Sequence, residues 1–352
     1  MKEILVIETG GTFATGAQGS IRSLNATNEK KVYDYEIVDT RIKKYNHNLT
    51  VQRPMYTLSE NMTIENLNNL VDFLYTVDYS KYDGVVLIHG TDTLAFTANL
   101  LSMVFAHIGI PIVMVSSNHP LSNPMSNGIS NFLAALDFIE KVGSKGVYVV
   151  YRNHSDVMQV HLGSRVKQMN QVIDAYESFK NINFGVIADS EFYLNSSKLN
   201  PSLEDISISN FEYKNKIILN KRVMLIHPYV GLRYDYYKID PELDAIVCGV
   251  YHSGTVNSQD VYIDQSINAL IEKAEEFDIP IFIGELTSGV ERYESIEKIK
   301  DSAVVFPAYD ISLENLYMKV HVGLSFVKDN LELFEFVNAD NIFFEKIKSK
   351  ES

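Results

Sequence analysis

The chain has 352 residues, of which 46% are hydrophobic and 22% charged, as in an ordinary globular protein. This length predicts two domains rather than one. The net charge of −14 makes most of the surface repulsive to a polyanion, so we expect no nucleic-acid partner. The single cysteine, Cys248, excludes an intramolecular disulfide and is expected to be buried in the apolar run 245–248.

The sequence also indicates where the protein works. No apolar stretch approaches the length needed to cross a bilayer, so no membrane association is expected. Near the N-terminus, Glu8 and the glycines after it interrupt the apolar run, which leaves no signal-peptide core. We therefore expect a cytoplasmic protein.

The first predicted element is a buried strand in the apolar run 4–7, which ends at Gly10, Gly11 and Thr12. In open α/β sheets, ligands bind at the carboxyl edge of the parallel strands, and a strand broken by two glycines places the next side chain there. Thr12 is therefore a candidate nucleophile. The alternative is that the glycines form only a tight turn and Thr12 is its hydrogen-bonded neighbour. A loop is expected to follow, to about Ile37.

The next stretches repeat this arrangement. An extended segment, 49–58, precedes a helix that Thr63 is expected to cap, so Ser59 and Glu60 fall in the loop between them. Residues 84–88 predict a second buried strand, broken at His89-Gly90-Thr91-Asp92-Thr93, and the spacing of apolar residues over 94–105 predicts a helix.

Strands and helices continue to alternate in the rest of the first half. Residues 110–115 and 146–151 predict strands, with a helix around 132–139 between them. Continuous apolar strands that alternate with helices indicate a parallel sheet covered on both faces. The predicted fold class is therefore α/β, with a larger N-terminal three-layer domain and a mostly parallel sheet over residues 1–192.

The composition changes at 193–220, which we interpret as a linker. Residues 221–352 predict a smaller C-terminal α/β domain, with strands at 223–226, 245–248 and 281–284 and a helix at 267–274. The tail from Leu313 is expected to be largely helical with a polar face.

The two glycine–threonine motifs together indicate catalysis by a threonine hydroxyl. A hydroxyl becomes an effective nucleophile when a neighbouring base takes its proton, and a threonine beside an aspartate and a lysine could have such a base. Thr9-Gly10-Gly11-Thr12 followed by His89-Gly90-Thr91-Asp92-Thr93 resembles the bacterial-type L-asparaginase family, which includes glutaminase-asparaginases. The resemblance covers nearly the whole chain and is closest to the cytoplasmic, type I members.

The resemblance implies roles for particular residues. Thr12 matches the threonine that forms the acyl-enzyme, and Thr91, Asp92 and Lys167 match the second catalytic set. Backbone amides near the two threonines would hold the oxyanion, and Gly11 and Gly90 are expected to be substrate-binding residues. Ser59 and Glu60 match the loop that binds the α-carboxylate and α-amino groups of the substrate, and Ser117 matches a residue whose backbone carbonyl contacts the amide.

The chain departs from the family pattern at two places. Members usually carry a tyrosine about a dozen residues after the nucleophile, whereas the first tyrosine after Thr12 here is Tyr33. The loop 116–120 also lacks the usual glycine. In the second half, the turn 251–255 resembles one that family members insert into the site of a neighbouring subunit, although a threonine stands where asparagine is commoner.

The resulting hypothesis is an amidohydrolase that converts L-asparagine to L-aspartate and ammonia through an acyl-threonine, with no metal and no cofactor. Histidines and cysteines at metal-ligand spacing are absent from the sequence. Three alternatives stay open: a glutaminase or related amide hydrolase, a tRNA-dependent amidotransferase subunit, and a non-catalytic member that binds an amino acid. The implied partner is a small amino-acid amide, and the resemblance implies a homodimer or homotetramer.

Overall fold

The computed structural model describes residues 1–11, 13, 16–18, 21–23, 30–170, 172–291, 293–339 and 341–348, with backbone alone at 16–18 and 21–23. The chain forms two compact units, Met1–Lys214 and Asn215–Ser352. None of the helices in these ranges is long and apolar enough to cross a membrane.

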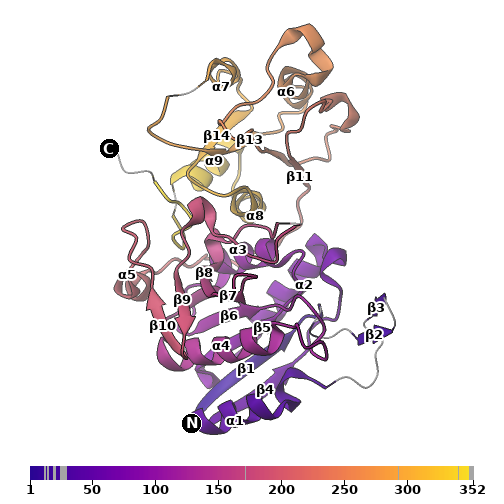
Figure 1. The fold of residues 1–352 in the computed structure, drawn as a ribbon. Coiled ribbons are helices and arrows are strands. Elements are labelled where there is room, and N and C mark those ends of the chain that lie inside the picture. The colour runs from indigo at the N-terminus through magenta and orange to yellow at the C-terminus, as the bar shows by residue number, and fades with distance from the viewer. Residues whose placement is uncertain are drawn as a thin grey trace. The chain divides into compact units, whose positions relative to one another are not determined.

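The first unit is built on an eight-stranded sheet with the order β10-β9-β8-β7-β6-β5-β1-β4 (Figure 1). Strands β4, β1, β5, β6 and β7 are parallel, whereas β8, β9 and β10 extend the sheet in antiparallel pairs. The bounds of these strands are β1 Lys2–Glu8, β4 His47–Gln52, β5 Gly84–Ile88, β6 Pro111–Val115, β7 Gly146–Arg152, β8 Met158–Leu162, β9 Gly185–Ala188 and β10 Glu191–Leu194. A separate two-stranded hairpin pairs β2 (Gly16–Gln18) with β3 (Ile21–Ser23).

Helices cover both faces of this sheet, with α1 and α4 on one side and α2 and α3 on the other (Figure 1). The central strands β5 and β6 are buried along their whole length, which explains their unbroken apolar sequences. The Thr63 hydroxyl caps α2 by accepting the Asn66 amide at 3.1 Å, as expected. The helix bounds are α1 Glu36–Tyr45, α2 Ile64–Tyr75, α3 Leu94–Phe105, α4 Gly128–Lys141 and α5 Leu203–Ile208.

The second unit contains a four-stranded parallel sheet with the order β11-β12-β13-β14. Cys248 lies fully buried in β12, where burial raises the pKa of its thiol to about 12. The bounds are β11 Val223–Ile226, β12 Ala245–Cys248, β13 Ile281–Leu286, β14 Val305–Tyr309, α6 Ile267–Glu275, α7 Glu294–Ile299, α8 Leu313–Gly323 and α9 Asn330–Ala339. Short 3₁₀ helices in the two units span Val32–Asp34, Ser59–Asn61, Tyr79–Lys81, Gly163–Arg165, Phe179–Asn181, Tyr234–Tyr236 and Asp260–Gln265.

The structure differs from the sequence-based expectation in two regions. The units divide between Lys214 and Asn215, so most of the stretch 193–220 belongs to the first unit and includes helix α5. The tail from Leu313 is largely helical, as expected, and forms α8 and α9, but α8 lacks the expected polar face because its Lys319 and His321 are buried. A buried carboxylate from the C-terminal segment, Glu345, neutralises the lysine at 2.7 Å.

Candidate active site

The carboxyl ends of β1 and β5 bring the two glycine–threonine motifs side by side. Glu8 is paired with Ile88 in the parallel register, and the Thr9 amide donates to the Ile88 carbonyl at 3.1 Å. The His89 amide continues the ladder by donating to the carbonyl of Val115, at the end of β6. Both motifs therefore leave the sheet at one edge.

Glycine is required at three positions of these motifs because the backbones touch. Gly10 and Gly11 have φ angles of +115° and +73°, which residues with a side chain rarely adopt. A Cβ on Gly10 would lie 2.1 Å from the Thr57 carbonyl oxygen, and one on Gly11 would lie 2.5 Å from the Gly90 Cα. A Cβ on Gly90 would lie 2.4 Å from the Ser59 Oγ. Gly10 and Gly11 are therefore packed directly against neighbouring backbone, and Gly90 against the Ser59 side chain.

Thr12, the expected nucleophile, lies outside the described residues. Gly11 before it and Phe13 after it are both buried. The Gly11 amide donates to the Thr57 carbonyl at 3.1 Å, so the chain entering Thr12 is held at the sheet edge. The role of Thr12 stays a prediction.

Ser59 and Asp92 form the polar centre of this edge. The Ser59 hydroxyl donates to the Asp92 Oδ2 at 2.6 Å and accepts the Asp92 amide at 3.3 Å, while the Thr93 hydroxyl donates to the Ser59 carbonyl at 3.0 Å. Ser59 is buried, whereas the side chains of Asp92 and Glu60 are exposed. A carboxylate that is anchored by a buried hydroxyl and open to solvent can accept an ammonium group.

Thr91 and Lys167 are half-buried, and both are attached to the segment 174–178. The Tyr176 hydroxyl donates to the Thr91 carbonyl at 2.7 Å, and the Lys167 amide donates to the Glu177 carbonyl at 2.8 Å. The backbone positions of both residues are therefore fixed relative to one segment, and the catalytic role of the Lys167 amine stays a prediction.

Ser117 is buried and lies in the loop directly after β6, the strand next to β5. Its hydroxyl donates to the His119 carbonyl at 2.6 Å and lies 2.9 Å from the Ser126 hydroxyl. The side chain therefore stabilises its own loop, and the expected substrate contact through its backbone carbonyl stays a prediction.

His89 supports the second motif in a way that the sequence analysis did not identify. Its Nδ1 lies 2.9 Å from the Gly90 carbonyl and its Nε2 lies 3.0 Å from the Thr97 hydroxyl. A carbonyl can only accept, so Nδ1 carries the proton and Nε2 accepts from Thr97. Full burial lowers the pKa of His89 to about 4, so the ring is neutral at pH 7 and serves as a rigid spacer.

Tyr33 lies beside the first motif. Its hydroxyl is 2.9 Å from the Arg53 Nη2, and the Arg53 Nε donates to the buried carboxylate of Glu8, the residue before Thr9. Burial and the negative charge of Glu8 raise the pKa of Tyr33 above its ordinary value. Tyr33 is therefore a neutral phenol connected to the end of β1 through one arginine.

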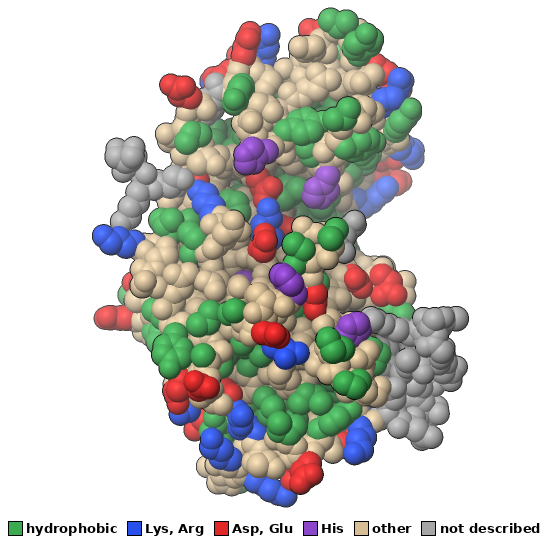
Figure 2. Space-filling model, in the orientation of Figure 1, with side chains coloured by type: hydrophobic (Ala, Val, Ile, Leu, Met, Phe, Trp, Pro, Cys, Tyr) green, Lys and Arg blue, Asp and Glu red, His purple; other side chains and the backbone are tan. Residues whose placement is uncertain are grey.

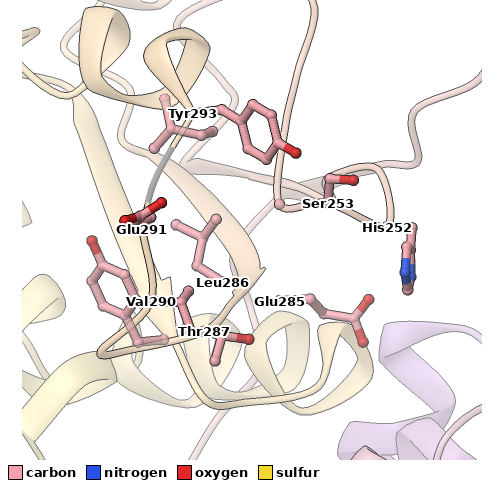
Figure 3. Close-up of a pocket in the computed structure, with 11 residues that line it drawn as sticks. His252, Ser253, Glu285, Leu286, Thr287, Val290, Glu291 and Tyr293 are labelled. Atoms are coloured by element: carbon pink, nitrogen blue, oxygen red, sulfur yellow. The ribbon is translucent and has the colours of Figure 1, made fainter.

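The second unit has a pocket of about 210 Å³ at the carboxyl ends of its own parallel strands (Figure 3). The turn 251–255 forms one wall and is closed by the Gly254 amide, which donates to the Tyr251 carbonyl at 2.7 Å. Glu285 follows the irregularity in β13, and its carboxylate points toward His252 (Figure 3).

Comparison with known proteins identifies the family. Residues 3–200, more than half of the chain, match the family model described as "Asparaginase, N-terminal". The chain belongs to the asparaginase family. The predicted family is thereby confirmed, and the chain is an amidohydrolase of the asparaginase type.

Relatives of this asparaginase-family protein carry two different names. It is 28% identical to an L-asparaginase of Thermococcus kodakarensis over 258 residues, which cover 72% of this chain and 74% of the relative. It is 26% identical to a subunit of the glutamyl-tRNA(Gln) amidotransferase of Aeropyrum pernix over 332 residues, covering 91% of this chain and 74% of the relative.

Solved structures show the same fold. The thermostable L-asparaginase of T. kodakarensis aligns with a TM-score of 0.75 at 22% identity, covering 99% of this chain and 100% of that one. L-asparaginase I of Vibrio cholerae aligns with a TM-score of 0.76 at 21% identity, covering 97% and 98%. The predicted α/β fold, with a large mostly parallel sheet and a smaller second domain, is confirmed.

The groups available for chemistry at the edge of the first sheet are hydroxyls, carboxylates, a lysine and backbone amides. Within the described ranges, no group of three or more histidine, cysteine or acidic side chains is arranged to hold a metal ion. On the face shown in Figure 2, basic side chains are interspersed with acidic ones.

Proposed function

We propose that this asparaginase-family protein hydrolyses the side-chain amide of L-asparagine to L-aspartate and ammonia, at the edge formed by β1, β5 and the segment 57–59. The observation that carries the proposal is the direct packing of Gly11, Gly90 and Ser59, with the carboxylate of Asp92 held at 2.6 Å from the Ser59 hydroxyl. This arrangement places bare backbone and an anchored anion beside each other at the edge of the sheet.

The substrate would be held by its α-amino and α-carboxylate groups. The exposed carboxylates of Asp92 and Glu60 suit the ammonium, and the Ser59 backbone amide suits the carboxylate. Binding through these groups would place the side-chain amide toward the glycines, where backbone amides near Thr91, such as that of Gly90, can stabilise an oxyanion.

The reaction would proceed in two steps. The Thr12 hydroxyl attacks the amide carbon, its proton passes to the leaving nitrogen, and ammonia departs as the C–N bond breaks to leave an acyl ester. Water, oriented by Thr91 and Lys167, then attacks the ester, and aspartate leaves as the threonine hydroxyl is restored. Lys167 acts as the base that relays the proton in both steps.

The test is ammonia release from asparagine by the wild type, Thr12→Ala and Lys167→Met. We expect each variant to lose at least about a hundredfold in kcat, as nucleophile and acid–base removals do. Thr76→Ala and Lys198→Met, at exposed positions of the same unit, serve as matched controls and are expected to keep wild-type rates. Wild-type rates in both site variants would reject the mechanism.

A second candidate is glutamine hydrolysis as part of a tRNA-dependent amidotransferase. The similarity to an amidotransferase subunit over 91% of this chain favours it. One methylene in the substrate is worth only about 1–3 kcal/mol of discrimination, so a direct comparison of kcat/KM for asparagine and glutamine is required. A preference for glutamine would make this the better assignment. Binding of either amino acid by calorimetry without turnover would instead indicate a non-catalytic member.

We further infer a homodimer or homotetramer. Apolar side chains of the second unit are unusually exposed, with Val230 at 96%, Val261 at 78% and Tyr262 at 66% of their full area. Sedimentation velocity is expected to give a mass of two or four chains, and a monomer at micromolar concentration would contradict the inference.

A further inference from the structure

The segment Asp174–Ser178 makes hydrogen bonds to three separate loops of the candidate site. Tyr176 bonds to Thr91, Asp174 accepts from the Asn118 side chain at 2.6 Å, and the Glu177 carbonyl accepts from the Lys167 amide at 2.8 Å. These loops follow β5, β6 and β8, so the segment connects three parts of the first unit that are far apart in the sequence. We propose that this segment is a positioning strap for the site and that the Tyr176 hydroxyl is its principal positioning group. The proposal rests on the proposed amide hydrolysis.

The strap is itself held rigidly. The Tyr176 amide donates to the Asn153 Oδ1 at 3.1 Å, and the Asn153 Nδ2 donates to the Tyr176 carbonyl at 3.1 Å. Tyr176 is fully buried, and its ring meets that of Tyr151 edge-on at 5.0 Å. The Tyr151 hydroxyl donates to the second oxygen of Asp174. The start and the middle of the strap are therefore held by partners outside the three loops.

The bond from Tyr176 acts on the peptide that carries the catalytic candidates. Its acceptor is the Thr91 carbonyl, which belongs to the peptide unit between Thr91 and Asp92. The nitrogen of that same unit donates to the Ser59 hydroxyl at 3.3 Å. The peptide is thus fixed at both ends, by Tyr176 on the carbonyl and by Ser59 on the amide. Loss of the phenol would free the peptide to rotate and would misplace the Thr91 hydroxyl.

The strap also accounts for the position of Lys167. Val166 forms an isolated antiparallel bridge with Ser178, and the Val166 carbonyl accepts from the buried Asn99 side chain at 2.9 Å. Asn99 lies in α3, the helix that begins directly after Thr93. Lys167 is therefore placed relative to Thr91 both through the strap and through α3.

The decisive variant is Tyr176→Phe, which removes one hydroxyl and keeps the ring. Tyr148→Phe is the matched control, because Tyr148 is also fully buried and donates to a backbone carbonyl, that of Lys145, at 2.8 Å. We expect both variants to lower the urea midpoint similarly. Only Tyr176→Phe should lower kcat for amide hydrolysis, by about tenfold, with KM changed less than twofold, since the placement of Thr91 matters in the transition state.

A second measurement does not depend on the reaction. Hydrogen–deuterium exchange of the amides in 91–97 is expected to become at least tenfold faster in Tyr176→Phe and to stay unchanged in Tyr148→Phe. If the wild type hydrolyses no amide, the proposed function fails, but the exchange measurement still tests whether Tyr176 positions the segment 91–97. Equal exchange in the two variants would overturn it, as would equal kcat values in an active enzyme.

A double-mutant cycle tests whether the strap acts as a unit. Asp174→Ala removes the acceptor for Asn118 and Tyr151 at the other end, and it also provides a test if Tyr176→Phe does not fold. We expect Asp174→Ala to lower kcat/KM, and the double variant to lose less than the product of the two single losses, because both act through one segment. If the loss of kcat/KM in the double variant equals the product of the two single losses, the hydrogen bonds of the segment act independently, and the proposal is overturned.

Discussion

At the residue scale, the backbone around Gly11 requires a glycine, whereas the backbone around Gly109 does not. Gly11 combines a positive φ with a neighbour, the Gly90 Cα, that lies where a side chain would begin. Gly109 has open space around the position of a Cβ. The same substitution at the two positions therefore separates a requirement of the site from the general cost of adding a methyl group.

We predict that Gly11→Ala lowers the free energy of unfolding by about 2–4 kcal/mol, since a strained backbone and a backbone clash each cost of order 1–3 kcal/mol. Ammonia release should fall at least about a hundredfold, because displaced reacting groups lose this much. Gly109→Ala should change stability by less than about 0.5 kcal/mol and leave activity intact. Urea unfolding and an ammonia assay check both. A stable, active Gly11→Ala protein would contradict the close packing.

Thr12, Thr91 and Asp92 could be proposed as site residues from the sequence because they lie in two short motifs with glycines. The partners that hold them could not. Tyr176 and Thr91 are 85 positions apart, and Ser59 and Asp92 are 33 apart. Nothing in the local pattern around Asp174–Ser178 marks a tyrosine that bonds to a distant carbonyl, since a buried aromatic residue in a loop is ordinary core.

At the element scale, buried parallel strands were predictable and polar helices in the core were not. Strand β5 and residues 4–7 of β1 are continuous apolar runs, which are typical of parallel strands buried on both faces. Helix α8 contains Lys319 and His321, residue types that are rarely buried, so its sequence predicts an exposed face. The lysine is buried because Glu345, 26 positions further along the chain, pairs with it.

This ion pair attaches the C-terminal segment to α8. Glu345 accepts from the Lys319 amine at 2.7 Å and from the amides of Ile342 and Phe343 at 3.0 and 2.9 Å. Although burial alone would raise it, the pKa of Glu345 lies below its ordinary value because of the charge and hydrogen bonds supplied by these partners. The carboxylate therefore stays ionised inside the second unit.

We predict that Lys319→Met lowers the free energy of unfolding by about 3–5 kcal/mol, because it leaves a buried carboxylate without its cation. Lys319→Met with Glu345→Gln should recover most of this loss, since the amide oxygen of glutamine still accepts from Ile342 and Phe343 without a charge. Urea unfolding followed by tyrosine fluorescence measures both variants. Equal losses in the single and double variants would show that shape, and not charge, dominates here.

At the scale of the whole molecule, buried histidines in both units make stability depend on pH. Burial lowers the pKa of His89 and His161 in the first unit and of His321 in the second to about 4. In the unfolded chain these rings titrate near their ordinary value of about 6.5. Between these values the unfolded state binds more protons than the folded state, so the free energy of unfolding falls as the pH falls.

The expected loss is up to about 1.4 kcal/mol per pH unit for each of the three rings between about pH 6.5 and 4. His321 provides the sharpest test, because neither ring nitrogen has a hydrogen-bond partner within the described part of the chain. His321→Phe should raise the free energy of unfolding by about 1–3 kcal/mol at pH 7, since an unsatisfied polar group leaves the core.

The His321→Phe variant should take up one proton fewer than the wild type on unfolding, so its free energy of unfolding should depend less on pH. Its gain in stability over the wild type should therefore be larger at pH 5 than at pH 7. His252→Phe, at an exposed position of the same unit, is the control for the loss of an imidazole and should leave the free energy of unfolding at pH 7 unchanged. Urea titrations at half-unit intervals from pH 4 to pH 8 measure the slope. An unchanged slope in His321→Phe would mean that the ring titrates alike in the folded and unfolded states, which would contradict the lowering of its pKa by burial in α8.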